Sequence, residues 1–140
     1  MSQVETNKQL AREFFRRIWN EREEAAIDEM SADGATGNDA DFGTGKEAFR
    51  ANWKQWMAAF PDLHFEIVEI IGEGEKVLTR WRLTGTHAGP GDFMGVAPSG
   101  RRIDVQGMSL DTIRNGQVVA GVDGWDAYGM RQQLGALPGA

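Results

Sequence analysis

The Asn115-Gly116 pair constrains the fold more than any other feature of this sequence, because it lies between two strand-like runs. An Asn-Gly pair favours a two-residue hairpin turn in which both residues have positive φ angles. The runs 101–114 and 117–123 are therefore predicted to form adjacent antiparallel strands. Asp123 then lies at the end of its strand that is remote from the turn.

Two further runs alternate apolar and polar residues at a period of two, which is typical of strands with one buried face. They cover residues 63–71 and 77–87, with a glycine-containing turn at 72–74 between them. In the second of these strands, the alternation places Arg80 and Arg82 on the face opposite to the apolar side chains.

Three N-terminal segments carry apolar residues at helical spacing, and each begins at a pair of residues typical of a capping box. The predicted helices span residues 6–19, 20–30 and 44–60. Residues 31–45, rich in Gly, Asp and Asn, predict a loop with one short strand. A last helix is predicted after Asp126, whose side chain is expected to cap it.

This element order predicts an α+β fold. We expect a conical barrel, in which a curved antiparallel sheet of four main strands, plus one short strand, wraps on three N-terminal helices and is followed by a C-terminal helix. A single domain accounts for residues 1–140, with 1–5 and 136–140 as loose tails. The outer sheet face would suit a two-fold contact, so a homodimer is predicted.

The composition favours a small apolar molecule as the partner. A net charge of −6 argues against nucleic acid, which needs a basic patch. No apolar run approaches the roughly 20 residues of a membrane span, and no basic-then-apolar leader is present, so no membrane contact is expected. The absence of cysteine fits a cytoplasmic protein and excludes thiolate chemistry.

Asp123 is the strongest candidate for chemistry, because it ends a strand and is surrounded by apolar residues. Burial of such a carboxyl group raises its pKa towards working pH, as proton transfer requires. Asp111 is expected to lie too near the hairpin to meet Asp123. Asp104 occupies an even position of its strand, so its side chain is expected on the face opposite to that of Asp123. The sequence therefore predicts a lone acid/base group.

Two glycines and a serine are predicted beside Asp123, namely Gly107, Gly121 and Ser109. Either they leave space for a ligand, or they mark a bulge or tight packing against the first helix. His87 either donates a hydrogen bond to a ligand carbonyl or holds the glycine-rich loop 85–100. The aromatic residues of the third helix, Trp53 among them, have core spacing, and some can also line a pocket.

The two histidines lie on opposite strand faces and have no cluster of other ligands around them, so no metal site is expected.

The order and spacing of several motifs resemble the SnoaL-like polyketide cyclases of the nuclear transport factor 2-like superfamily. The motifs are 60–65 (FPDLHF), 80–87, 95–100 (GVAPSG), Asn115-Gly116 and 132–135 (QQLG), and the resemblance extends from Asn7 to Gly135. It implies a dimeric conical barrel with an apolar cavity. It also implies intramolecular aldol ring closure, as in antibiotic biosynthesis, without metal or cofactor.

The resemblance also implies roles for residues. Asp123 matches the acid/base aspartate, Asn38 a pocket asparagine and Trp19 a pocket aromatic residue; Phe15 and Trp125 join them as candidate substrate-binding residues. The family's histidine and glutamine on the preceding strand are replaced here by Ser109 and Gly107, which removes two donors to an enolate oxygen.

The leading hypothesis is a cyclase or isomerase, of the lyase type, that acts on an apolar, enolisable, polyketide-like molecule. Hydroxylation of an aromatic polyketide and a non-catalytic binding or dimerisation module are the alternatives. Epoxide hydrolysis by an Asp–Arg–Asp arrangement is disfavoured, because Arg80 and Arg82 are predicted to point away from Asp123.

Overall fold

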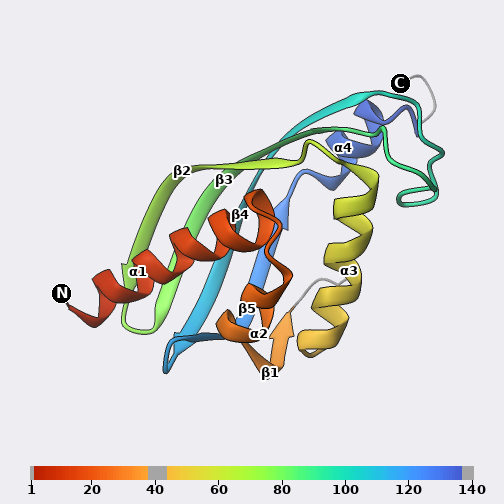
Figure 1. The fold of residues 1–140 in the computed structure, drawn as a ribbon. Helices are drawn as coiled ribbons and strands as arrows, with labels where there is room; N and C mark the ends of the chain where they lie inside the picture. The colour runs from red at the N-terminus through yellow and green to blue at the C-terminus, as the bar shows by residue number, and fades with distance from the viewer. Residues whose placement is uncertain (1, 38–43, 137–140) are drawn as a thin grey trace.

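A strongly curved sheet with helices on its concave side organises the chain (Figure 1). The computed structural model describes residues 2–37 and 44–136. The elements are α1 (Gln3–Phe14), the π-helical turn η1 (Phe15–Asn20), α2 (Glu24–Met30), β1 (Ser31–Gly37), α3 (Lys46–Ala59), β2 (His64–Glu73), β3 (Lys76–Thr86), β4 (Arg102–Arg114), β5 (Gln117–Trp125) and α4 (Ala127–Gln133). The predicted α+β architecture is confirmed.

The sheet has the strand order β1-β5-β4-β3-β2. The four long strands form the predicted antiparallel meander, and β1 adds to its edge in parallel with β5. Asn115 and Gly116 join β4 to β5 with φ angles of 53° and 76°, which confirms the predicted hairpin turn.

The capping predictions for the N-terminal helices were wrong. α1 begins at Gln3, where the Ser2 hydroxyl accepts a hydrogen bond of 3.1 Å from the Glu5 amide. Residues 3–5 are therefore helical and not part of a loose tail. α3 starts after Gly45, which has a φ angle of 95° and makes no side-chain cap.

Asn20 has a tertiary role in place of the predicted cap of α2. Its side-chain amide donates to the Phe65 carbonyl over 2.9 Å and accepts from the Phe65 amide over 2.8 Å. These two bonds fix the end of η1 to β2, and a long-range contact has replaced the local one that the sequence suggested. By contrast, the predicted cap of α4 is confirmed, because Asp126 accepts a 2.8 Å bond from the Gly129 amide.

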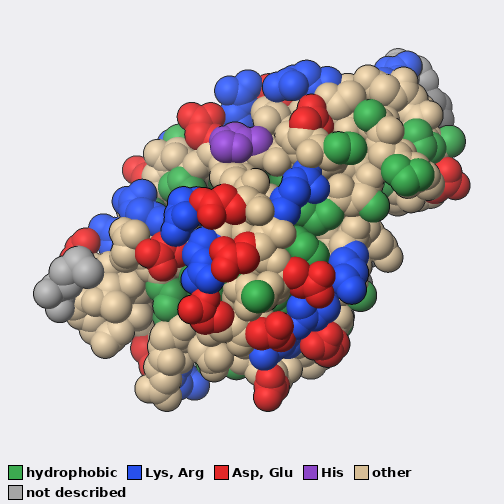
Figure 2. All heavy atoms as spheres, viewed as in Figure 1, with side chains coloured by type: hydrophobic (Ala, Val, Ile, Leu, Met, Phe, Trp, Pro, Cys, Tyr) green, Lys and Arg blue, Asp and Glu red, His purple; other side chains and the backbone are tan. Residues whose placement is uncertain are grey.

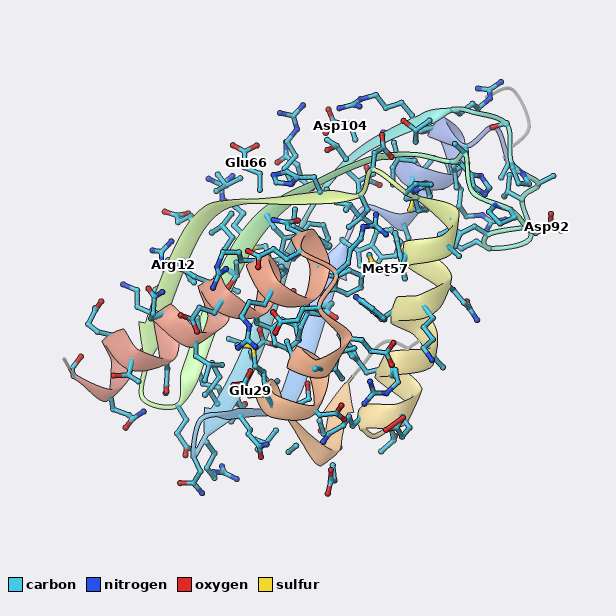
Figure 3. The ribbon with its side chains drawn as sticks, in the orientation of Figure 1. Arg12, Glu29, Met57, Glu66, Asp92 and Asp104 are labelled. Carbon is cyan, nitrogen blue, oxygen red and sulfur yellow. The ribbon has the colours of Figure 1, made fainter. Side chains whose placement is uncertain are left out.

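The two faces of the sheet differ in character. The concave face carries the buried residues of β3, such as Trp81 and Leu83. On the convex face, Arg80 pairs with Glu69 and Arg82 with Asp104. Figure 3 shows Asp104 pointing away from the helices.

Exposed apolar side chains also lie on the convex strands, namely Ile71, Met108, Leu110 and Val122. The homodimer contact through this face stays a prediction.

The core fills the space between the helices and the concave face. Its fully buried side chains include Ile18, Ile27, Phe60 and Ile103. Acidic and basic side chains alternate over the helical side of the molecule (Figure 2). Among the described residues, no helix is both long enough and apolar enough to cross a bilayer.

Candidate functional site

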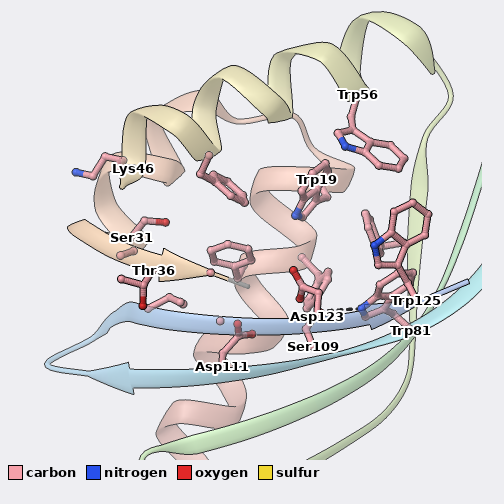
Figure 4. A pocket seen from close by; sticks show the side chains of 18 of the residues that line it. Trp19, Ser31, Thr36, Lys46, Trp56, Trp81, Ser109, Asp111, Asp123 and Trp125 are labelled. Carbon is pink, nitrogen blue, oxygen red and sulfur yellow. Dashed lines mark hydrogen bonds between the residues drawn. The ribbon is translucent and has the colours of Figure 1, made fainter. Parts of the chain in front are cut away.

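A cavity of about 140 Å³ lies between the concave sheet face and the helices α1, η1 and α3. Its wall is mainly aromatic, with Phe14, Trp19, Phe49, Trp56, Phe65 and Trp125 among the lining residues. The side chains of Asp111 and Asp123 project from the sheet into this space, as Figure 4 shows. The site is thus an apolar cavity with two carboxyl groups on the side formed by the sheet.

A β-bulge in β5 determines which residues reach the cavity. From the turn, Ile113 pairs with Val118, but the next pair is Thr112 with Ala120, so Val119 is an extra residue on β5. The bulge shifts the register by one, and Ser109 becomes the partner of Asp123. Bulges near active sites re-aim side chains in this way.

The bulge also interrupts the alternation of side chains between the two faces of β5. Strict alternation would place Val118 and Val122 on one face, but Val118 is buried and lines the cavity, whereas Val122 is 52% exposed. The faces are exchanged at the extra residue, Val119.

Asp111 lies on the same side of the cavity as Asp123, contrary to the prediction that it lies too near the hairpin. It pairs with Gly121, two residues before Asp123 on the same face of β5. Burial, and then the nearby charge of Asp123, raise the pKa of Asp111 to about 7. The predicted lone carboxylate is therefore one member of an interacting pair.

The glycines beside Asp123 make room for other side chains of the chain itself. A Cβ atom on Gly107 would lie 2.5 Å from the Trp81 indole and 2.6 Å from the Cβ of Trp125. A Cβ atom on Gly121 would lie 2.9 Å from Oδ1 of Asp111. The structure thus favours tight packing at both glycines, against indoles and a carboxyl group and not against the first helix.

Ser109 is held by a hydrogen bond from Trp81, whose Nε1–H donates to the serine Oγ over 3.0 Å (Figure 4). A serine hydroxyl has one donor hydrogen and can accept two bonds. Because Trp81 uses one acceptor position, the hydroxyl hydrogen remains available for a group in the cavity. Ser109 is also the direct cross-strand neighbour of Asp123.

The structure brings together five of the predicted site residues. Asp123, Ser109, Trp19, Phe15 and Trp125 all line the cavity. Trp53 does not line it, because its Nε1–H donates to the Ile18 carbonyl over 2.9 Å within the core. Asn38 lies outside the described residues.

His87 is placed away from the cavity. Its side chain is fully buried, and its ring lies 5.4 Å from that of Phe60 and 6.3 Å from that of Phe93. Its backbone amide donates to the Arg101 carbonyl, and its carbonyl accepts from the Gly100 amide. This placement agrees with the loop-holding interpretation and not with ligand contact.

Two charged cavity residues were not among the predicted site residues: Asp111 was considered and rejected, and Lys46 was not considered. Asp111 lies two residues after Ser109 on β4 and therefore on the same face of the sheet, and this spacing could have identified it. The Lys46 ammonium lies 3.0 Å from Asp33 and is turned away from both cavity aspartates (Figure 4). Lys46 therefore contributes its aliphatic part to the wall and its charge to a surface pair.

Solved structures of similar fold come from several bacteria. TsrD from Streptomyces laurentii is 26% identical, with 98% of this chain and 99% of that chain covered and a TM-score of 0.86. A proposed SnoaL-like polyketide cyclase from Jannaschia sp. is 26% identical, with coverages of 99% and 98% and a TM-score of 0.84. AclR from Streptomyces galilaeus, a proposed hydroxylase, is 28% identical, with coverages of 96% and 88% and a TM-score of 0.81.

None of the curated proteins compared with this chain matches it. The sequence profile of the SnoaL-like polyketide cyclases, in contrast, matches residues 9–134, which is most of the chain. Together with the fold described above, this match leads to one conclusion: the chain belongs to the SnoaL-like polyketide cyclase family.

Proposed function

We propose that this protein is an acid/base enzyme that acts on a small, apolar, enolisable carbonyl compound. Asp123 removes a proton from the carbon next to the carbonyl group and later returns it. The observation that carries this proposal is the pair of carboxyl groups, Asp123 and Asp111, that project into an aromatic cavity. No cofactor is needed for such a reaction.

Ser109 supports the same chemistry. Enolate formation moves negative charge to the carbonyl oxygen, and a fixed donor near that oxygen stabilises the charge. The Trp81 hydrogen bond orients the Ser109 hydroxyl next to Asp123. We propose that Ser109 supplies a donor at the place where the family's larger donor residues are absent.

The cavity volume limits the size of the substrate. About 140 Å³ is below the roughly 300 Å³ at the lower end of typical ligand sites. It is close to an engineered cavity of about 150 Å³ that binds benzene. We therefore propose a ligand with one aromatic ring or a similar apolar group in the cavity, and this size argues against a fully enclosed multi-ring polyketide.

Phenylacetone is a suitable probe, because it joins one aromatic ring to an enolisable ketone. We expect the protein to accelerate exchange of its α-protons in deuterium oxide, followed by NMR, above the rate in buffer. The Asp104→Asn variant, altered on the convex face, serves as a matched control and should exchange like the wild type. If the ketone binds but exchanges no faster than in buffer, the non-catalytic binding module is the better description.

Hydroxylation is a second candidate, favoured by the similarity to AclR, a proposed hydroxylase. In this case molecular oxygen would supply the oxygen atom of the product. Incubation of aromatic polyketide substrates under isotope-labelled oxygen separates the two reactions, since only hydroxylation places the label in the product.

A further inference from the structure

The relative position of the two cavity carboxyl groups is set by the register of β4 and β5. Asp123 pairs with Ser109, and Asp111 pairs with Gly121, so the two aspartates are diagonal neighbours on one face. Diagonal neighbours in an antiparallel pair lie about 7–8 Å apart, within reach of long side chains or of a shared ligand. A carbonyl group and its α-carbon could therefore contact both aspartates.

Gly121 fixes where the Asp111 carboxyl group lies. A Cβ atom at Gly121 would be only 2.9 Å from Oδ1 of Asp111, so the carboxyl group occupies the space above the β5 backbone. It reaches over the strand that carries Asp123. Any larger residue at position 121 would displace it.

The described residues that line the cavity place no positive charge beside the Asp111 carboxyl group. Among the described cavity-lining residues, only Asp111, Asp123 and Lys46 have titratable side chains, and the Lys46 ammonium is paired with Asp33. No described residue donates a hydrogen bond to Asp111. Two carboxyl groups in this setting retain one proton between them more readily than they bear two charges.

Asp62 shows how hydrogen-bond donors affect the pKa of an aspartate. Burial raises the pKa of Asp62, but that pKa is lowered overall by hydrogen bonds from the Thr86 amide (2.7 Å) and hydroxyl (2.9 Å), together with its own backbone amide and the charge of Arg102. Asp111 lacks such donors among the described residues, and its pKa is raised to about 7. Asp62 is also exposed at the surface, whereas Asp111 lines the cavity, so burial and the lack of described donors together favour the protonated form of Asp111 near neutral pH.

We propose that Asp111 is a second catalytic carboxyl group, which donates a hydrogen bond to the ligand carbonyl oxygen while Asp123 removes the α-proton. The proton passes from carbon to a carboxylate oxygen of Asp123, and the electron pair of the C–H bond forms the enolate double bond. The charge that develops on oxygen is stabilised by the Asp111 O–H. Return of the proton to carbon reverses these changes, so no other reactant is needed.

This arrangement also predicts ligand class, and it rests on the proposed function. A neutral ketone or aldehyde can accept a hydrogen bond from protonated Asp111. A carboxylic acid ligand would be ionised near neutral pH, and the charge of Asp123 would repel it. The cavity should thus bind phenylacetone in preference to phenylacetate.

The carbonyl stretching band of bound phenylacetone, isotope-labelled at its carbonyl carbon, tests this proposal by infrared spectroscopy. We expect a shift to lower frequency at about pH 6 that is lost at about pH 9, where Asp111 is ionised. Asp111→Leu, similar in shape but without a donor, should abolish the shift at both pH values. Asp111→Asn keeps a donor but cannot titrate, so its shift should not depend on pH, and Asp104→Asn should behave as the wild type.

The outcomes separate this inference from the proposed function. A shifted band that persists in Asp111→Leu, or no shifted band in the wild type at the highest soluble ketone concentration, overturns the role of Asp111. Rapid α-proton exchange in that case would still support the proposed function. Conversely, a shift that depends on Asp111 without any exchange would support Asp111 as a hydrogen-bond donor to the bound carbonyl, but it would contradict both its catalytic role and the enzyme proposal.

Discussion

Replacement of Asp123 by asparagine is expected to slow α-proton exchange of phenylacetone by roughly 10²- to 10⁴-fold, the usual contribution of a positioned acid/base group. The amide keeps the size and shape of the carboxylate but cannot take a proton. Because Asp123 lines the cavity and is only partly buried, the fold should be retained. Exchange rates measured by NMR at fixed pH, with circular dichroism as the check on folding, give the comparison.

The control for this variant is Asp104→Asn. Asp104 lies on β4 and pairs with Arg82 on the convex face, so the same change of charge occurs outside the cavity. Its exchange rate should equal that of the wild type. An Asp123→Asn protein that is folded and exchanges at the wild-type rate would show that another group performs the proton transfer.

Replacement of Asp111 by asparagine is expected to stabilise the protein at alkaline pH. An acid whose pKa is raised on folding contributes stability below its unfolded pKa and loses it as the pH rises through the folded value. The pKa of folded Asp111 is about 7. Between about pH 5 and pH 8 the wild type should therefore lose about 3 kcal/mol that the variant retains.

Urea unfolding of both proteins at the two pH values measures this difference. The free energies of unfolding should differ more at the higher pH, with the asparagine variant more stable. A constant difference across the range would mean that Asp111 ionises equally well in the folded and unfolded chains. Such a gain in stability at the expense of activity is expected when a buried polar group of an active site is replaced.

The strands were predictable because their signals are local. The Asn115-Gly116 turn identifies β4 and β5 as neighbours, and the alternation in β3 identifies its buried face, without help from distant residues. Asp126 was likewise recognised as a cap, since its bond to the Gly129 amide spans three residues. The order of these elements predicted the conical α+β fold, and the resemblance of the motifs to one family implied the same fold.

The parts that could not be predicted depend on contacts far apart in the chain. Asn20 matches a cap in sequence, yet its amide bonds the backbone of Phe65, 45 residues away. The bulge at Val119 has no local sequence signal, so the burial of Val118 and the exposure of Val122 could not be predicted. Asp111 was dismissed because its distance from the hairpin was judged without the register of β4 and β5.

The aromatic residues show the same limit. Trp53 and Trp56 are both buried on α3, but only Trp56 lines the cavity. The difference arises from the direction each side chain takes relative to η1, where the Ile18 carbonyl accepts the Trp53 indole N–H. Helical periodicity identifies the buried face of a helix, but it cannot tell which residues on that face pack in the core and which line a cavity.

NMR titration of isotope-labelled aspartate carboxyl groups tests most directly whether the cavity holds a proton-sharing pair. One carboxyl signal, absent from Asp111→Asn, should titrate with a pKa of about 7. In Asp123→Asn the same signal should titrate at lower pH, because the repelling charge is gone, yet burial should keep it above the ordinary value of about 3.9. If every aspartate of the wild type titrates near that ordinary value, Asp111 does not carry a proton at neutral pH and the two-carboxylate site is wrong.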